Sequence, residues 1–146
     1  MDYQQVQTQI RQGQYALFYL FFGEETMLSR NLVRQLEEGL LQGSLKDFNY
    51  AVFDGETTGL VEVINSANTL PVFSTKRLVV VKNAPWFDAG IEGTGEEELL
   101  LAYLENPSPT TCLVFFAGDK VDARRRPYKT LAKKGIVLKT SFPKRG

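Results

Sequence analysis

Five short apolar runs alternate along the chain with longer stretches in which apolar residues recur every three or four positions. The runs occupy residues 16–22, 48–53, 77–81, 112–116 and 136–139. They are too short for buried helices and are rich in aromatic and β-branched side chains, so each predicts a strand. Between the first two runs, Leu28, Leu32, Leu36 and Leu40 repeat every four residues, which predicts a helix with one apolar face.

The five strands are expected to form one parallel sheet. Their sequences are apolar throughout and do not alternate with polar residues, which is typical of strands buried on both faces. Parallel neighbours need crossover connections, and the helical stretches supply them. We therefore predict an α/β fold with helices on both faces of the sheet, in a single domain spanning residues 1–146.

Glycine, proline and capping patterns mark where the helices begin and end. Gly13 and Gly135 follow helical stretches and are expected to end them. Thr94 and Glu97 form a capping-box pattern at the start of the helix before the fourth strand. Pro127 falls inside the last helical stretch, where it either begins the helix or kinks it.

The composition is that of a water-soluble globular protein, with 43% hydrophobic and 23% charged residues. No apolar run approaches the roughly 20 residues that a membrane helix needs, and residues 1–14 lack the apolar core of a secretory signal. The chain has no His and a single Cys, Cys112, which we expect in the core of the fourth strand. We therefore expect no disulfide, metal site, cofactor or catalytic residue, and a reducing, cytoplasmic setting.

Charge is distributed unevenly although the net charge is zero. Residues 1–119 carry seven basic and sixteen acidic side chains, whereas residues 120–146 carry ten basic ones and one acidic one. A basic end can attract phosphate or an acidic protein surface, and it can equally be a solvated helix face. The candidate residues for contact with DNA or another subunit are Arg124, Arg125, Arg126, Lys129, Lys133 and Lys134.

The turn after the first strand occupies the position of a phosphate-binding loop but lacks its residues. A phosphate loop needs two glycines and a Lys, and this turn reads Gly23, Glu24 and Glu25. Carboxylates at a helix N-terminus repel phosphate. The third strand ends on Lys82 and Asn83 in place of an Asp that could hold magnesium. We interpret the turn as a degenerate phosphate loop; an atypical nucleotide hydrolase is the alternative.

An unusual apolar segment follows the third helix. Leu70, Val72 and Phe73 crowd a helix end that Pro71 has terminated. They either cap the core between the helix and the third strand or form a protruding plug that enters pockets on a partner. Each buried side chain of this kind is worth roughly 1.5–3 kcal/mol, enough to make Phe73 a hot spot.

Several segments together resemble the N-terminal domain of the bacterial DNA polymerase III delta-subunit family. They read FFGEE, FNYAVFDGE, LPVFSTKRLVVVKNA and YLENPSPTTCLVFFAGDKVD, and the resemblance covers essentially the whole chain. It implies a RecA-like fold of the AAA+ type: a three-layer sandwich with strand order 5-1-4-3-2 and a degenerate phosphate loop. Members of the family continue into a lid domain and a collar domain, so the sequence is expected to be the first domain of a longer protein.

The resemblance also implies a function, which is to open the sliding clamp for loading onto primed DNA. The family's clamp-binding pair falls on Val72 and Phe73, with Leu70 and Pro71 as supporting contacts, which favours the plug over the core-capping alternative. The implied partners are the sliding clamp (beta subunit), the other loader subunits (delta prime and gamma/tau) and, through the complex, primer-template DNA. ATP is hydrolysed by other subunits. The isolated domain is expected to be a monomer without enzymatic activity, within a nucleotidyltransferase holoenzyme.

Overall fold

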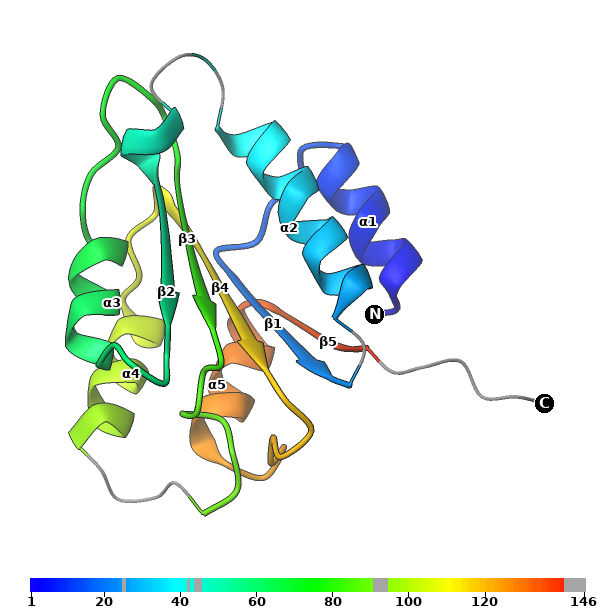
Figure 1. Cartoon of the computed structure of the whole chain (residues 1–146), viewed down its shortest axis with the longest axis vertical. Coiled ribbons are helices and arrows are strands. Elements are labelled where there is room, and N and C mark those ends of the chain that lie inside the picture. Colours follow the sequence, from blue (N-terminus) through cyan, green and yellow to red (C-terminus); the bar gives the residue numbers. More distant parts are fainter. Residues whose placement is uncertain (25, 42, 44–45, 91–94, 141–146) are drawn as a thin grey trace.

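Five parallel strands form one sheet in the order β2-β3-β4-β1-β5 (Figure 1). The structure, a computed structural model, describes residues 1–146 except 25, 42, 44–45, 91–94 and 141–146. The strands are β1 (Phe18–Gly23), β2 (Tyr50–Asp54), β3 (Arg77–Lys82), β4 (Thr111–Ala117) and β5 (Ile136–Thr140). The predicted strand order, read from the other edge of the sheet, is confirmed.

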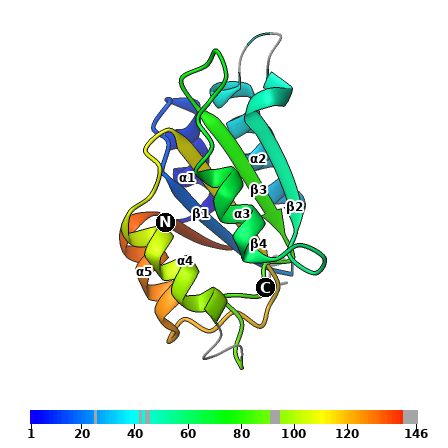
Figure 2. The same ribbon diagram turned by 90° about the vertical axis from the view of Figure 1, so that its left-hand side faces the viewer.

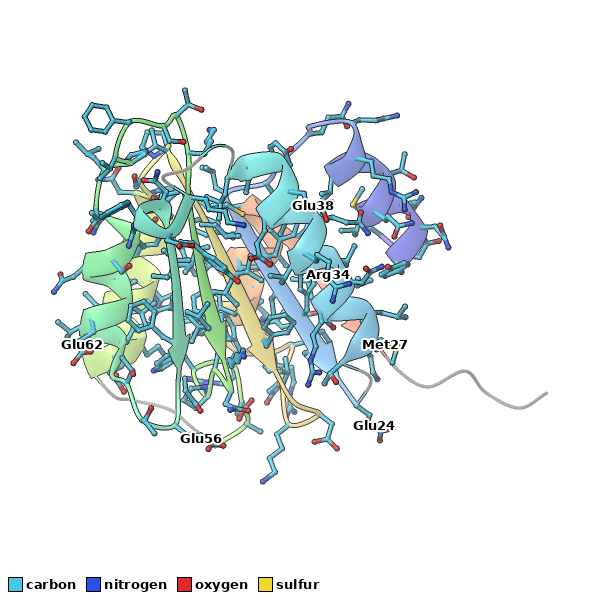
Figure 3. All side chains as sticks on the ribbon, turned by 45° about the horizontal axis from the view of Figure 1, so that its top comes forward. Glu24, Met27, Arg34, Glu38, Glu56 and Glu62 are labelled. Atoms are coloured by element: carbon cyan, nitrogen blue, oxygen red, sulfur yellow. The ribbon has the colours of Figure 1, made fainter. Side chains whose placement is uncertain are left out.

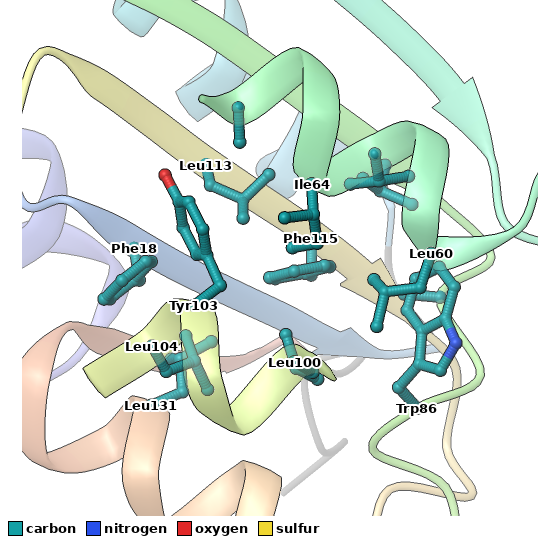
Figure 4. Close-up of a cluster of buried hydrophobic side chains, with 14 of the residues drawn as sticks. Phe18, Leu60, Ile64, Trp86, Leu100, Tyr103, Leu104, Leu113, Phe115 and Leu131 are labelled. Carbon is teal, nitrogen blue, oxygen red and sulfur yellow. The ribbon is translucent and has the colours of Figure 1, made fainter. Parts of the chain in front are cut away.

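Helices cover both faces of this sheet and make three layers (Figures 1 and 2). The helices are α1 (Tyr3–Arg11), α2 (Met27–Leu40), α3 (Leu60–Ala67), α4 (Gly95–Glu105) and α5 (Arg126–Lys134). One core lies between the sheet and α2, with Val6 and Ile10 of α1 added to it. The other lies between the sheet and α3, α4 and α5 (Figure 4).

Central strand β4 contributes to both cores, as expected for a strand covered by helices on each side. Phe115 faces the α3–α5 side, where its ring lies 5.0 Å from that of Phe87 and 6.2 Å from that of Trp86. Cys112 faces the α1–α2 side and is buried, which confirms it as a core residue. Burial raises the pKa of its thiol.

Helix ends follow the sequence signals closely. Pro127 lies in the first turn of α5 and so begins the helix without kinking it. Gly135 ends α5. The capping box predicted before α4 includes Thr94, which lies outside the described residues.

The predicted second strand begins two residues too early. Residues Lys46–Asn49 form a short 3-10 helix, η1, and β2 starts only at Tyr50. The carbonyl oxygen of Phe48 accepts a hydrogen bond from the guanidinium of Arg77, a side-chain contact that a strand ladder would not make. The edge strand β2 is only partly covered on its faces, and Val52 is 47% exposed, so the expected burial on both faces is wrong for this strand.

Candidate functional site

The apolar segment 70–73 protrudes from the end of the sheet at which the strands begin. It lies between α3 and β3, at the end of the sheet opposite to the C-terminal ends of the strands (Figure 1). Phe73 is 92% exposed, Leu70 71% and Val72 39%. The core-capping alternative is therefore wrong. We call residues 70–73 the plug; its role as a binding element stays a prediction.

The backbone presents the plug in a conformation that an aromatic residue rarely adopts. Phe73 has φ 49°, in the left-handed region. A bulky residue held there without burial of its side chain is typical of a site in which surrounding contacts fix the backbone for a functional reason. Asn49 contacts this turn directly, and Arg77 binds residues that lie before it in the chain.

Asn49, the last residue of η1, binds the plug backbone at two points. Its Oδ1 accepts from the Val72 N–H over 2.6 Å, and its Nδ2 donates to the Val72 carbonyl oxygen over 2.9 Å. The Asn49 residue is 1% exposed. Sequence reasoning missed Asn49, because an Asn before a strand carries no pattern that distinguishes it from an ordinary turn residue.

Arg77, the first residue of β3, ties the end of α3 to η1. Its Nε and Nη2 donate to the carbonyl oxygen and the hydroxyl of Ser66 over 2.8 and 2.6 Å, and its Nη1 donates to the Phe48 carbonyl oxygen over 3.0 Å. Burial lowers the pKa of this guanidinium. The two ends of the segment that carries the plug are therefore held against the residues that precede β2.

A separate pocket of about 310 Å³ lies at the C-terminal ends of the strands, where a nucleotide would bind in a RecA-like fold. Gly23, Arg30, Lys82 and Asn83 line it, and its described lining contains no carboxylate. Glu24 is exposed where β1 ends and α2 approaches (Figure 3). Glu25, the other acidic residue predicted here, lies outside the described residues.

The Asp54-Gly55-Glu56 segment that supports the resemblance closes the turn after β2. Asp54 Oδ1 accepts from the backbone N–H of Glu56 over 2.9 Å and from Nδ2 of Asn83 over 3.2 Å. These hydrogen bonds lower the pKa of the Asp54 carboxyl, because they stabilise its charged form. A Cβ on Gly55 would come 2.5 Å from the carbonyl oxygen of Asn83. The segment therefore joins the ends of β2 and β3.

Most of the predicted basic patch is paired with acidic residues of the same domain. Arg124 pairs with Asp122, and α5 residues pair with α4: Arg126 with Glu98 at 3.5 Å, and Lys134 with Glu105 at 3.3 Å. Lys129 and Lys133 are exposed on α5. The positive charges of this face are thus largely neutralised by Asp122 and by the acidic residues of α4, which favours the solvated-face interpretation.

Arg125 is not a surface residue, contrary to its place in the predicted patch. It precedes α5, and its side chain is 4% exposed. Its guanidinium pairs with Glu97 Oε1 at 3.0 Å and donates to the carbonyl oxygens of Trp86 and Asp88 over 2.8 and 2.9 Å. It therefore cannot contact DNA or a neighbouring subunit without leaving the interior.

Within the described part of the chain, no group of three His, Cys, Asp or Glu side chains is placed to hold a metal ion. No helix in the same residues is long and apolar enough to cross a membrane.

Comparison with known proteins shows which protein family most of the chain resembles. Residues 19–141 match the family model described as DNA polymerase III, delta subunit. The chain is 32% identical over 134 residues to the DNA polymerase III subunit delta of Bacillus subtilis (strain 168), an alignment that covers 88% of this chain and 38% of that protein. The chain thus spans about two fifths of the length of this curated relative.

Solved structures give a consistent result. The chain is similar to the Bacillus subtilis DNA clamp loader delta protein, with a TM-score of 0.87 and 29% identity over 95% of this chain and 42% of that one. A DNA polymerase III gamma subunit-related protein from Thermotoga maritima shares the fold, with a TM-score of 0.62 and 20% identity over 96% of this chain and 47% of that one. With the matched family model and the Bacillus relative, these findings establish that the chain belongs to the DNA polymerase III delta-subunit family.

Proposed function

We propose that this chain is the clamp-binding domain of a clamp-loader delta subunit. In this proposal, Phe73 and Val72 enter a hydrophobic pocket of the sliding clamp, with Leu70 and Pro71 at the rim. The observation that carries the proposal is the 92% exposure of Phe73 on a turn whose backbone is fixed from outside the turn. An exposed aromatic on an ordered turn is typical of a binding hot spot.

The energetics suit a binding role without chemistry. Burying Phe73 or Val72 on a partner would contribute roughly 1.5–3 kcal/mol each. If the complete contact forms only when a subunit interface of the ring-shaped clamp is open, binding shifts the population of rings toward the open state. ATP hydrolysis then resides in other subunits of the loader. The complex, which also contains delta prime and gamma/tau, delivers the opened ring to primer-template DNA.

The first prediction tests the plug directly. The combined variant Val72→Ser and Phe73→Ala should weaken binding of the 146-residue chain to its cognate sliding clamp by about 3–6 kcal/mol, because burial of each side chain contributes roughly 1.5–3 kcal/mol. A surface biosensor with immobilised clamp measures the affinity, and circular dichroism measures the fold. The circular dichroism spectrum should not change, since both side chains are exposed in the free domain.

Val61→Ser is the matched control, because Val61 is an apolar residue of α3 with 58% exposure outside the plug. It should bind the clamp as the unmodified chain does. Loss of the folded spectrum in the plug variant, or equal losses of affinity in plug variant and control, would contradict the proposal.

The second prediction concerns the pocket at the C-terminal ends of the strands. Titration calorimetry with ATP and Mg²⁺ should show no saturable heat. A phosphate loop needs backbone amides and a Lys around the phosphates. Here Gly23 packs against Thr140, and the side-chain Nδ2 of Asn83 donates to Asp54 Oδ1. Saturable heat that disappears in Arg30→Ala, a variant of the pocket lining, would instead support the nucleotide-binding alternative.

A further inference from the structure

We propose that Asn49 is a positioning residue for clamp binding, which acts by holding Val72 so that Phe73 is presented to the partner. This inference rests on the proposed function. Asn49 is remote from the plug in sequence. Its side-chain amide pairs with the backbone of Val72 as a neighbouring strand would: Oδ1 accepts from the Val72 N–H, and Nδ2 donates to the Val72 carbonyl oxygen. If Oδ1 and Nδ2 were exchanged, Nδ2 would face the Val72 N–H and Oδ1 would face the Val72 carbonyl oxygen, so neither hydrogen bond could form. The two contacts therefore define a single orientation of the amide.

The plug depends on this contact because its own backbone is poorly connected. Between the described residues, the backbone from Leu70 to Lys76 makes no backbone-to-backbone hydrogen bond; the nearest are those of Thr69 to Ser66 and of Arg77 to Thr110. Pro71 has no N–H to donate. Both polar backbone atoms of Val72 are therefore held by a side chain. Without that side chain, water would compete for them and the turn would sample other conformations.

Asn49 is itself rigidly placed. It is 1% exposed, it directly precedes β2, and the carbonyl oxygen of the preceding residue, Phe48, accepts from Arg77. Arg77 also holds Ser66 near the C-terminal end of α3. Arg77 thus connects the residue before Asn49 with both ends of the segment between α3 and β3, which carries the plug. A turn fixed in its bound conformation loses less entropy on association, which raises affinity without adding a contact to the partner.

A double-mutant cycle tests the inference. The affinities of Asn49→Ala, Phe73→Ala and the combined variant for the cognate sliding clamp are measured with the 146-residue chain. We expect Asn49→Ala to weaken binding by about tenfold when Phe73 is present and by much less when residue 73 is Ala, because Asn49 acts mainly through the presentation of Phe73. Asn65→Ala, which changes an exposed Asn of α3, should leave affinity unchanged.

The outcomes separate this inference from the proposed function. If Phe73→Ala binds as well as the unmodified chain, the proposed function fails. If Phe73→Ala weakens binding and Asn49→Ala does not, the positioning role alone is overturned. Equal factors for Asn49→Ala with Phe and with Ala at position 73 also overturn it, because they indicate a general structural effect.

Asn49→Asp keeps the inference testable if Asn49→Ala fails to fold. The Asp keeps the shape and the acceptor for the Val72 N–H, but an ionised carboxylate cannot donate to the Val72 carbonyl oxygen, whereas the protonated acid can. At neutral pH this variant should therefore bind more weakly than the unmodified chain. As pH falls through the pKa of the new carboxyl, its affinity relative to the unmodified chain at the same pH should recover. A relative affinity that is constant with pH would overturn the positioning role.

Discussion

Replacing Arg125 with Met should lower the free energy of unfolding by about 3–5 kcal/mol, the usual cost of removing one partner of a buried ion pair. The guanidinium makes three contacts that a Met side chain cannot reproduce: an ion pair with Glu97 and hydrogen bonds to the carbonyl oxygens of Trp86 and Asp88. Met keeps most of the apolar length of the side chain, so the loss reports on the polar contacts. Urea unfolding followed by circular dichroism measures the change.

Arg126→Met provides a matched control one residue further along the chain. The Arg126–Glu98 pair has side chains 71% and 70% exposed, and exposed pairs contribute at most about 1 kcal/mol. The control should therefore unfold at nearly the same urea concentration as the unmodified chain. Similar losses for both variants would show that Arg125 is not held in the interior as described.

The contrast between Arg125 and its two neighbours shows a limit of sequence reasoning. Arg124, Arg125 and Arg126 form one run, and nothing in the run distinguishes the buried residue from the exposed ones. The distinction arises because residues 86–88 leave two carbonyl oxygens facing the start of α5, while α4 brings Glu97 to the same point. All three partners of Arg125 are distant from it in sequence, so its burial depends on how α4 and residues 86–88 pack against the start of α5.

The sheet could be predicted because its signal is local. Runs such as 77–81 and 112–116 are apolar over nearly their whole length, and burial on both faces leaves that pattern in any parallel sheet. The start of β2 was placed wrongly because Phe48 reads as a strand residue. Its carbonyl oxygen is instead bound by the side chain of Arg77, a non-local contact that overrides the local preference.

The plug could be located from the sequence, but not its exposure or its support. A Pro with apolar neighbours after a helix fits a core cap as well as a protruding turn, and only the resemblance favoured the second. Asn49 could not be found, because the feature that marks it is its contact with Val72, and that contact exists only once β2 and β3 are side by side. Candidate binding residues were therefore accessible to sequence reasoning, whereas the residue that positions them was not.

Gly23→Ala should lower the free energy of unfolding by about 2–6 kcal/mol, from two separable causes. Gly23 has φ 124°, a sparsely populated region that costs an L-residue about 1–3 kcal/mol, and an added Cβ would overlap the carbonyl oxygen of Thr140 on β5, which adds about 1–3 kcal/mol of overpacking. From its sequence, this glycine is predicted to belong to a degenerate phosphate loop. The contact with Thr140 gives it a structural requirement, since β1 and β5 pair at this position.

Two further glycines separate these causes. Gly13→Ala tests backbone conformation alone, because Gly13 has φ 77° and nothing lies within 4 Å of an added Cβ. Gly135→Ala tests crowding alone, because its φ is −139° and the added Cβ would lie 2.5 Å from the Phe18 carbonyl oxygen. Urea unfolding of the three variants should give a loss for Gly23→Ala close to the other two losses combined. A Gly23→Ala loss no larger than that of Gly13→Ala would show that β5 moves aside, and that the glycine is not required by the pairing of β1 with β5.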